Sequence, residues 1–156
     1  MTNTAEPVAE MLSREHREID AAIEGFSADP SSGKAVESLA AAIVALRRHI
    51  YVEEEGLFPM LSAGSLVPPI LVMLREHAQI WATLDALEND LSTAGGQAPE
   101  ICHRLLIQLQ HHNMKEERIL YPQADEALAT RAAPSLTEFL QSGPLPDGWV
   151  CLRART

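Results

Sequence analysis

Apolar residues recur every three or four positions through four long stretches of the chain, which is the spacing of one face of an α-helix. These stretches are residues 5–25, 35–61 and 68–91 and a fourth that begins at residue 99. Short segments rich in Ser, Asp, Pro or Gly separate them and predict loops. Four long helices joined by short loops predict an all-α fold, an antiparallel up-down-up-down four-helix bundle.

Proline positions predict where the helices are disturbed. Gly56 and Pro59 should bend or fray the end of the second helix, and Pro122 should interrupt the fourth, with a short helix following to residue 129. Another short helix is expected at 134–140, before an irregular tail. We therefore divide the chain into a bundle, residues 1–130, and a C-terminal extension, residues 131–156. Trp149 in the tail is expected to dock on the core, with a lid or a dimer contact as alternatives.

Composition supports a single helical domain and limits the partners. The chain has 156 residues, 46% of them apolar but only 4% aromatic, which favours helices over sheets. Its formal charge of -10, from 22 acidic and 12 basic residues, would repel phosphate. Nucleic acid and anionic membrane surfaces are therefore disfavoured as partners, whereas a protein partner is compatible with this charge.

The cysteines and the N-terminal residues favour a cytoplasmic protein. Cys102 and Cys151 form neither a Cys-x-x-Cys pair nor a disulfide framework, so we expect two reduced thiols. The first ten residues lack the basic and apolar regions of a signal peptide. No apolar run reaches the length of a membrane span.

One ordered set of polar residues occurs twice. Arg14-Glu15-His16 returns as Arg75-Glu76-His77, and His49, Glu53, Glu54, Leu57, Phe58 and Pro59 return as His112, Glu116, Glu117, Leu120, Tyr121 and Pro122. Histidine and glutamate four positions apart lie about 40° apart around a helix and so share a face. We predict that the repeated residues are metal ligands supplied by all four helices: His16, His49, Glu53, His77, His112 and Glu116.

The two copies of the repeat predict two metal ions. We expect His16, His49 and Glu53 to serve mainly one ion, and His77, His112 and Glu116 the other. The two carboxylates should bridge the ions, together with one solvent-derived oxygen. Imidazole with carboxylate at five or six coordination suits iron, with manganese second. Zinc prefers four ligands, and magnesium and calcium prefer oxygen.

Other polar residues near the repeat are not expected to bind metal directly. Glu54 and Glu117 are candidates for contacts behind the ligands or for the helix surface. His103 should face solvent, and His111 is not expected to bind metal, with a contact behind a ligand as the alternative. Glu100-x-x-His103 is the sole Glu-x-x-His in the chain, whereas ferritin-like di-iron bundles need two.

The order H…HxxxE…H…HxxxE resembles the hemerythrin family, in particular bacterial hemerythrin-like proteins with the HHE cation-binding domain. The resemblance spans roughly residues 8–130 and implies a four-helix bundle with an oxo-bridged di-iron centre. Met73 stands where oxygen-carrying hemerythrin has a second histidine on the third helix. The site should therefore be more open, with an exchangeable position on each iron.

Three functions are compatible with this site. The first is binding or sensing of O2 or NO; the second is a redox enzyme that acts on peroxide or NO or repairs iron-sulfur centres; the third is a metal-storage or structural bundle. We find no general acid or base besides the ligands and no appended domain, which favours binding. We also expect Tyr51, Tyr121 or Trp149 to tune access to the metals, with Tyr51 facing mostly away.

Overall fold

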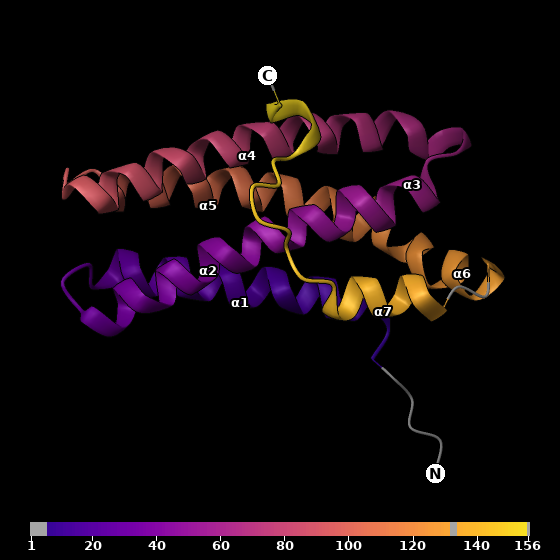
Figure 1. Cartoon of the computed structure of the whole chain (residues 1–156), viewed down its shortest axis with the longest axis horizontal. Helices are drawn as coiled ribbons and strands as arrows, with labels where there is room; N and C mark the ends of the chain where they lie inside the picture. The colour runs from indigo at the N-terminus through magenta and orange to yellow at the C-terminus, as the bar shows by residue number, and fades with distance from the viewer. Residues whose placement is uncertain (1–5, 132–133, 156) are drawn as a thin grey trace, which may run out of the picture.

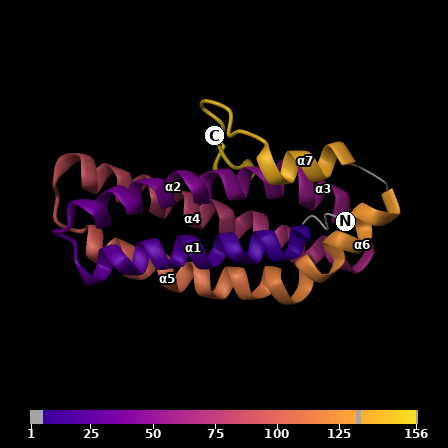
Figure 2. The same ribbon diagram turned by 90° about the horizontal axis from the view of Figure 1, so that it is seen from below.

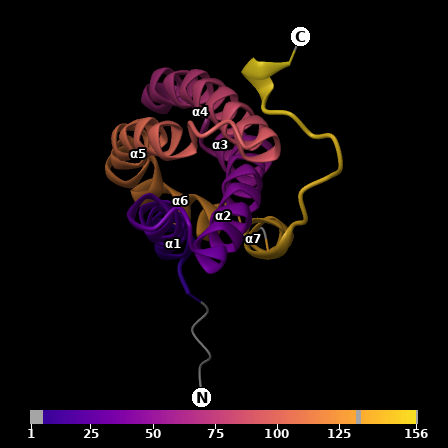
Figure 3. The same ribbon diagram turned by 90° about the vertical axis from the view of Figure 1, so that its left-hand side faces the viewer.

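The computed structural model describes residues 6–131 and 134–155 and has an all-α fold. Its four long helices are α1 (Val8–Ala28), α2 (Gly33–Val52), α4 (Val67–Thr93) and α5 (Ala98–Lys115). Consecutive long helices run antiparallel to each other (Figure 1). The end view shows all four arranged around a common interior (Figure 3). The predicted four-helix bundle is confirmed.

The second and fourth long helices widen where the sequence predicted bending or interruption. η1 (Glu53–Leu57) and η3 (Glu116–Leu120) are π-helical turns, and α3 (Phe58–Leu61) and α6 (Tyr121–Arg131) continue directly from them. The N–H of Phe58 donates to the Glu53 carbonyl, and that of Tyr121 donates to the Glu116 carbonyl. The next residue is proline in both copies and has no N–H, so the regular α-helical ladder cannot continue there. The helix therefore changes its pitch instead of fraying.

Side-chain oxygens accept hydrogen bonds from backbone N–H groups at the starts of α1 and α2. The Asp125 carboxylate of α6 accepts hydrogen bonds from the Val8 and Ala9 N–H groups at 2.8 and 3.1 Å. These contacts fix the start of α1 to the end of the second hairpin. Ser32 caps α2 by accepting from the Ala35 N–H at 3.2 Å. The short 3-10 turn η2 (Gly64–Leu66) leads into α4.

Two apolar clusters fill the bundle, one towards each end. One includes Ile23 and Leu84, near the loops that join the long helices, and the other includes Leu12 and Leu57, near α3 and α6. The buried histidines and glutamates lie between these clusters along each helix. A polar layer in the middle of an apolar core is costly unless its charges are paired or bind a metal, so this layer marks a functional site.

The C-terminal extension lies on the outside of the bundle. Helix α7 (Pro134–Ser142) lies beside α2 (Figures 2 and 3) and also contacts η1. The chain then crosses to α4, where the 3-10 turn η4 (Leu152–Ala154) makes contact. Trp149 packs against the core as expected, with ring centroids 5.1 Å from Tyr51 and 5.5 Å from Trp81.

Two further features bear on the expectations from the sequence. Cys102 and Cys151 are both free and buried, and burial raises the pKa of each thiol to about 11. They are therefore poor nucleophiles at neutral pH. Across residues 6–131 and 134–155, no helix is both long enough and apolar enough to pass through a membrane.

Candidate metal centre

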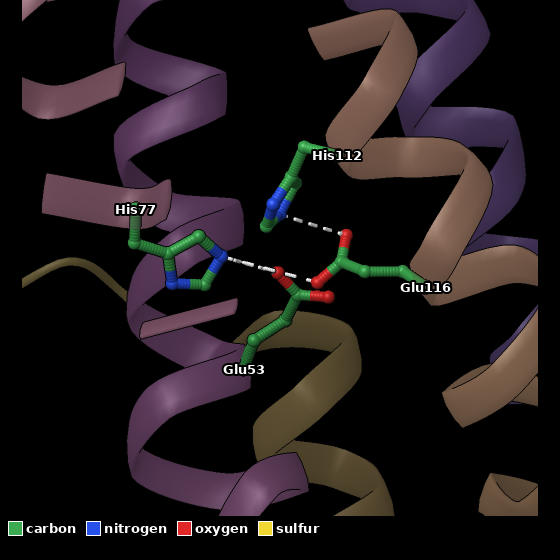
Figure 4. Close-up of side chains that lie close together, drawn as sticks. All are labelled: Glu53, His77, His112 and Glu116. Carbon is green, nitrogen blue, oxygen red and sulfur yellow. Dashed lines mark ion pairs between the residues drawn. The ribbon is translucent and has the colours of Figure 1, made fainter. Parts of the chain in front are cut away.

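All six predicted ligands meet in the polar layer, and none is more than 4% exposed. They form two groups in which one nitrogen or oxygen atom from each residue lies within 4.8 Å of the others. The groups are Glu53, His77, His112 and Glu116, and His16, His49 and Glu116. Figure 4 shows the side chains of the first group directed toward one another from α4, α5 and the two π-helical turns.

Glu116 faces imidazoles from both hairpins. Its Oε1 lies 3.2 Å from His16 Nε2 and 3.3 Å from His112 Nε2. Its Oε2 lies 3.9 Å from His77 Nε2. One carboxylate can therefore reach both groups of ligands, which is the position a bridging ligand requires.

Glu53 occupies the matching position on the other side. Its Oε1 lies 3.4 Å from both His49 Nε2 and His77 Nε2, one from each hairpin. The sequence assigned Glu53 mainly to the ion held by His16 and His49. The geometry differs, because it places Glu116 with that histidine pair and both carboxylates with the other pair.

Several buried atoms at the centre have no hydrogen-bond partner among the described residues. They include Glu53 Oε1, His77 Nε2 and Glu116 Oε2. Buried polar atoms without partners are rare and costly, and a cation bound between them would satisfy all three. The residues present therefore fit a cation, and their mixture of imidazole nitrogen and carboxylate oxygen suits iron or manganese.

Charges within the cluster favour the protonated forms of His49, His77 and His112 when no metal is bound. Burial lowers the pKa of His112, but the Glu116 and Glu76 carboxylates outweigh burial and raise it to about 10. Burial opposes charge on His49 and His77 as well, yet neighbouring carboxylates raise the pKa of both. Burial also raises the pKa of Glu116, but His112 and His16 outweigh it and hold that pKa well below its usual range. In the metal-free cluster, His112 and Glu116 therefore form a buried ion pair, with His112 Nε2 3.3 Å from Glu116 Oε1.

Carboxylates also lie behind the histidines. Glu15 Oε2 is 2.7 Å from His49 Nδ1, and Glu76 Oε1 is 3.1 Å from His112 Nδ1. A carboxylate that accepts from Nδ1–H leaves Nε2 free for a metal and fixes the ring orientation. These two residues were not singled out from the sequence. The available signal was their place directly before His16 and His77 in both copies of the repeat.

The remaining two carboxylates break the symmetry of the repeat. Glu54 Oε1 lies 2.8 Å from His77 Nδ1, so Glu54 contacts a candidate ligand from behind. Its equivalent, Glu117, lies 3.8 Å from His16 Nδ1, and its side chain is 38% exposed. Within the described residues His16 Nδ1 has no hydrogen-bond partner. A hollow of about 640 Å³ between α1 and α5 also reaches His16, so this side of the site is the more open.

Tyr121 places a hydroxyl inside the cluster. Its Oη donates to Glu53 Oε2 at 2.6 Å and lies 3.1 Å from the Nε2 atoms of both His16 and His49. Burial and then the nearby Glu116 and Glu53 charges raise the pKa of this phenol well above 10, so it stays protonated. The equivalent residue, Phe58, stacks on His77 and carries no hydroxyl.

The other aromatic candidates lie outside the ligand cluster. Tyr51 packs against Phe139 and Trp149 in the outer layer, consistent with a side chain that faces mostly away from the site. The Trp149 Nε1–H donates to Glu55 Oε1 at 3.0 Å, and Glu55 belongs to neither group of candidate ligands. Of the three aromatic residues, Tyr121 alone is hydrogen-bonded to the predicted ligands in the part of the chain that the structure describes.

Residues that the sequence placed outside the site also lie outside the two groups. His103 and His111 are exposed. Met73, at the position of the missing histidine, is 1% exposed and belongs to an apolar cluster. Neither group of candidate ligands in the described residues contains a further histidine in its place.

Comparison with known families agrees with this geometry. The model of the family described as "Hemerythrin HHE cation binding domain" matches residues 7–124. This match covers the four long helices and both π-helical turns, and confirms the resemblance inferred from the repeat. No curated protein and no solved structure shows significant similarity to the chain.

Proposed function

Because the chain belongs to the hemerythrin family of HHE cation-binding domains, we propose that it holds two iron ions and binds or senses O2 or NO. The observation that carries this proposal is the buried set of four imidazoles and two carboxylates, with each carboxylate facing both hairpins. Bound iron would supply reversible binding of a diatomic molecule and electrons for its reduction. Manganese is the second candidate.

The surroundings of the centre support a small ligand. The cluster is almost fully buried, while the hollow beside His16 brings solvent close to one group of ligands. We extend the proposal to a cytoplasmic location, which two buried and unpaired thiols support.

One observation favours a second function. The Tyr121 hydroxyl is a hydrogen-bond donor inside the ligand cluster, at 2.6 Å from Glu53. A donor at this position can stabilise charge that develops on a bound oxygen or nitrogen atom. This supports a redox enzyme acting on peroxide or NO as the alternative to reversible binding.

Metal analysis with gas binding tests the proposal. We expect about two irons per chain and near-ultraviolet bands of bridged ferric iron, a number that follows from two ligand groups. The protein should then be reduced without air and exposed to O2 or to NO. A new absorption band that disappears when the gas is removed would support binding or sensing. Oxidation without a stable adduct would favour the enzyme, and zinc or no metal would contradict both.

Replacing Tyr121 by phenylalanine should change the rate of ligand binding. The substitution removes only the hydroxyl that contacts Glu53, His16 and His49. We expect gas association or dissociation measured by stopped flow to change by about tenfold, the effect of one lost hydrogen bond of about 1–1.5 kcal/mol. Tyr51→Phe is the matched control, because Tyr51 lies in the outer layer. Equal rates in both variants and the unaltered protein would remove Tyr121 from the mechanism.

A further inference from the structure

The C-terminal tail is hydrogen-bonded to the acidic residues that follow Glu53. The backbone N–H of Leu152 donates to Glu54 Oε2 at 2.8 Å. Beside this contact, Trp149 Nε1–H donates to Glu55 Oε1, and Arg155 lies 3.6 Å from the same oxygen. These tail residues lie beyond the part of the chain that the family model matches, residues 7–124.

Glu54 connects the tail directly with the metal centre. While Oε2 accepts from the Leu152 backbone, Oε1 lies 2.8 Å from His77 Nδ1. The Glu54 side chain is only 3% exposed, although the exposed tail lies on its Oε2 side. On the far side of the same ring, His77 Nε2 faces Glu53 at 3.4 Å. A carboxylate held at both oxygens cannot rotate freely, and it fixes the ring that it contacts.

The internal repeat supplies a comparison within the same molecule. Glu117 occupies the position of Glu54 in the second copy. Its side chain is 38% exposed and lies 3.8 Å from His16 Nδ1, too far for a hydrogen bond. In the described part of the chain the tail contacts Glu54 but makes no hydrogen bond to Glu117. The carboxylate held by the tail is thus the one that reaches its histidine.

Apolar contacts keep the tail in place over this site. The Trp149 ring lies edge-on to Tyr51 and Trp81, with centroids 5.1 and 5.5 Å away. Cys151, one residue before the donor, is fully buried in the core cluster. The packed side chains of Trp149 and Cys151 therefore fix the backbone just before the Leu152 N–H. The Leu152 side chain itself is 48% exposed.

We propose that residues 149–152 form a positioning element of the metal centre, in which the Leu152 backbone holds Glu54 against His77. Glu54 is the positioning residue: it accepts from Nδ1–H and leaves Nε2 of His77 unprotonated and directed at the metal. The two ends of the site then differ, with a ligand fixed by the tail on the His77 side and a looser ligand on the His16 side. This inference rests on metal binding in the proposed function and not on the identity of the gas.

Leu152→Pro removes the donor with little other change. Proline lacks the backbone N–H, and Leu152 is the first residue of η4, a position that accepts proline. Cys151, which precedes it, has φ -60 and ψ 150, the extended conformation that a following proline favours. Leu152→Ala is the matched control, because it also removes the exposed side chain but keeps the N–H.

The experiment titrates the metal-free full-length protein and its variants with Co²⁺, whose visible and paramagnetic NMR spectra report each ion separately. We expect Leu152→Pro to lower the affinity for one of the two Co²⁺ ions about tenfold, which is the usual effect of losing a partner behind a metal ligand. The affinity for the other ion should not change. The ring N–H proton of His77 should also exchange with solvent faster. Leu152→Ala should match the unaltered protein in both measurements.

A second variant keeps the test valid if Leu152→Pro disturbs folding. Glu54→Gln leaves the tail sequence intact and should lower the affinity for the same ion. Glu117→Gln should leave the affinity for both ions unchanged. In the double variant Glu54→Gln/Leu152→Pro the losses should not add, because both act through one hydrogen bond. Unaltered affinity in Glu54→Gln, or additive losses, would overturn the positioning role. Failure of the unaltered protein to bind two ions would instead overturn the proposed function.

Discussion

Glu116→Gln is expected to abolish tight binding of both metal ions, whereas His49→Ala should remove only one. Glu116 belongs to both groups of candidate ligands, and its two oxygens face His16, His112 and His77. A neutral amide has one carbonyl oxygen and cannot bridge two cations. Loss of a residue behind a ligand costs about 10–100-fold in affinity, so loss of a shared ligand should exceed about 100-fold for each ion.

The neighbouring residue provides the control for this prediction. Glu117→Gln makes the same chemical change one position further along, on a side chain that is 38% exposed. It should retain near-normal metal content. Metal per chain after dialysis and the melting temperature are the two measurements. Loss of one ion present at about 1,000 times its dissociation constant removes about 4 kcal/mol, so loss of both ions removes about 8 kcal/mol. At about 2–4 °C per kcal/mol, the melting temperature should fall by roughly 16–32 °C. Two retained ions in Glu116→Gln would contradict the bridging role.

The clustering of the six candidate ligands could be predicted because helical spacing fixes the direction of their side chains. His49 and Glu53 lie four positions apart, as do His112 and Glu116, so each pair shares a helix face whatever the rest of the fold does. The duplicated order then places equivalent residues on opposite sides of the bundle. Nothing beyond local geometry and the repeat was needed to bring these residues together.

The carboxylates behind the histidines depend on contacts between helices, which spacing along one helix does not encode. Glu15 precedes His16 directly, and adjacent residues lie about 100° apart around a helix, so it cannot serve that histidine. It contacts His49 on α2 instead, because α1 and α2 pair as a hairpin. The exact pairing of two helices must be known before such a partner can be identified.

Tyr121 illustrates a local change in helix geometry. In a regular α-helix a residue five positions after Glu116 points about 140° away from it. The wider π-helical turn of η3 brings Tyr121 back toward the same side, so its hydroxyl lies 3.2 Å from Glu116 Oε1. Pro122 indicated a disturbance of the helix at this point, but the sequence did not specify its type. The contact between the tail and Glu54 could not be predicted from the sequence either, because residues 143–151 have no helical periodicity from which to place them.

The metal-free protein is expected to lose stability as pH rises, while the stabilisation that metal provides should grow. The pKa of His112 in the folded, metal-free cluster is raised from 6.5 to about 10. A raised pKa contributes stability that is fully present below pH 6.5 and is lost as pH rises through about 10. His49 and His77 are shifted in the same direction and add to the effect.

Metal binding has the opposite dependence, because only neutral imidazole can bind the ion and each bound proton must be displaced. The difference in melting temperature between iron-loaded and chelator-treated protein should therefore widen between about pH 6.5 and pH 9. Parallel thermal melts at several pH values in one buffer series measure both effects. A His112→Gln variant should flatten the dependence of the metal-free protein, since its amide does not titrate. If the difference in melting temperature between iron-loaded and chelator-treated protein stays constant with pH, metal binding releases no protons. The histidines would then be neutral in the metal-free cluster, which would contradict the prediction.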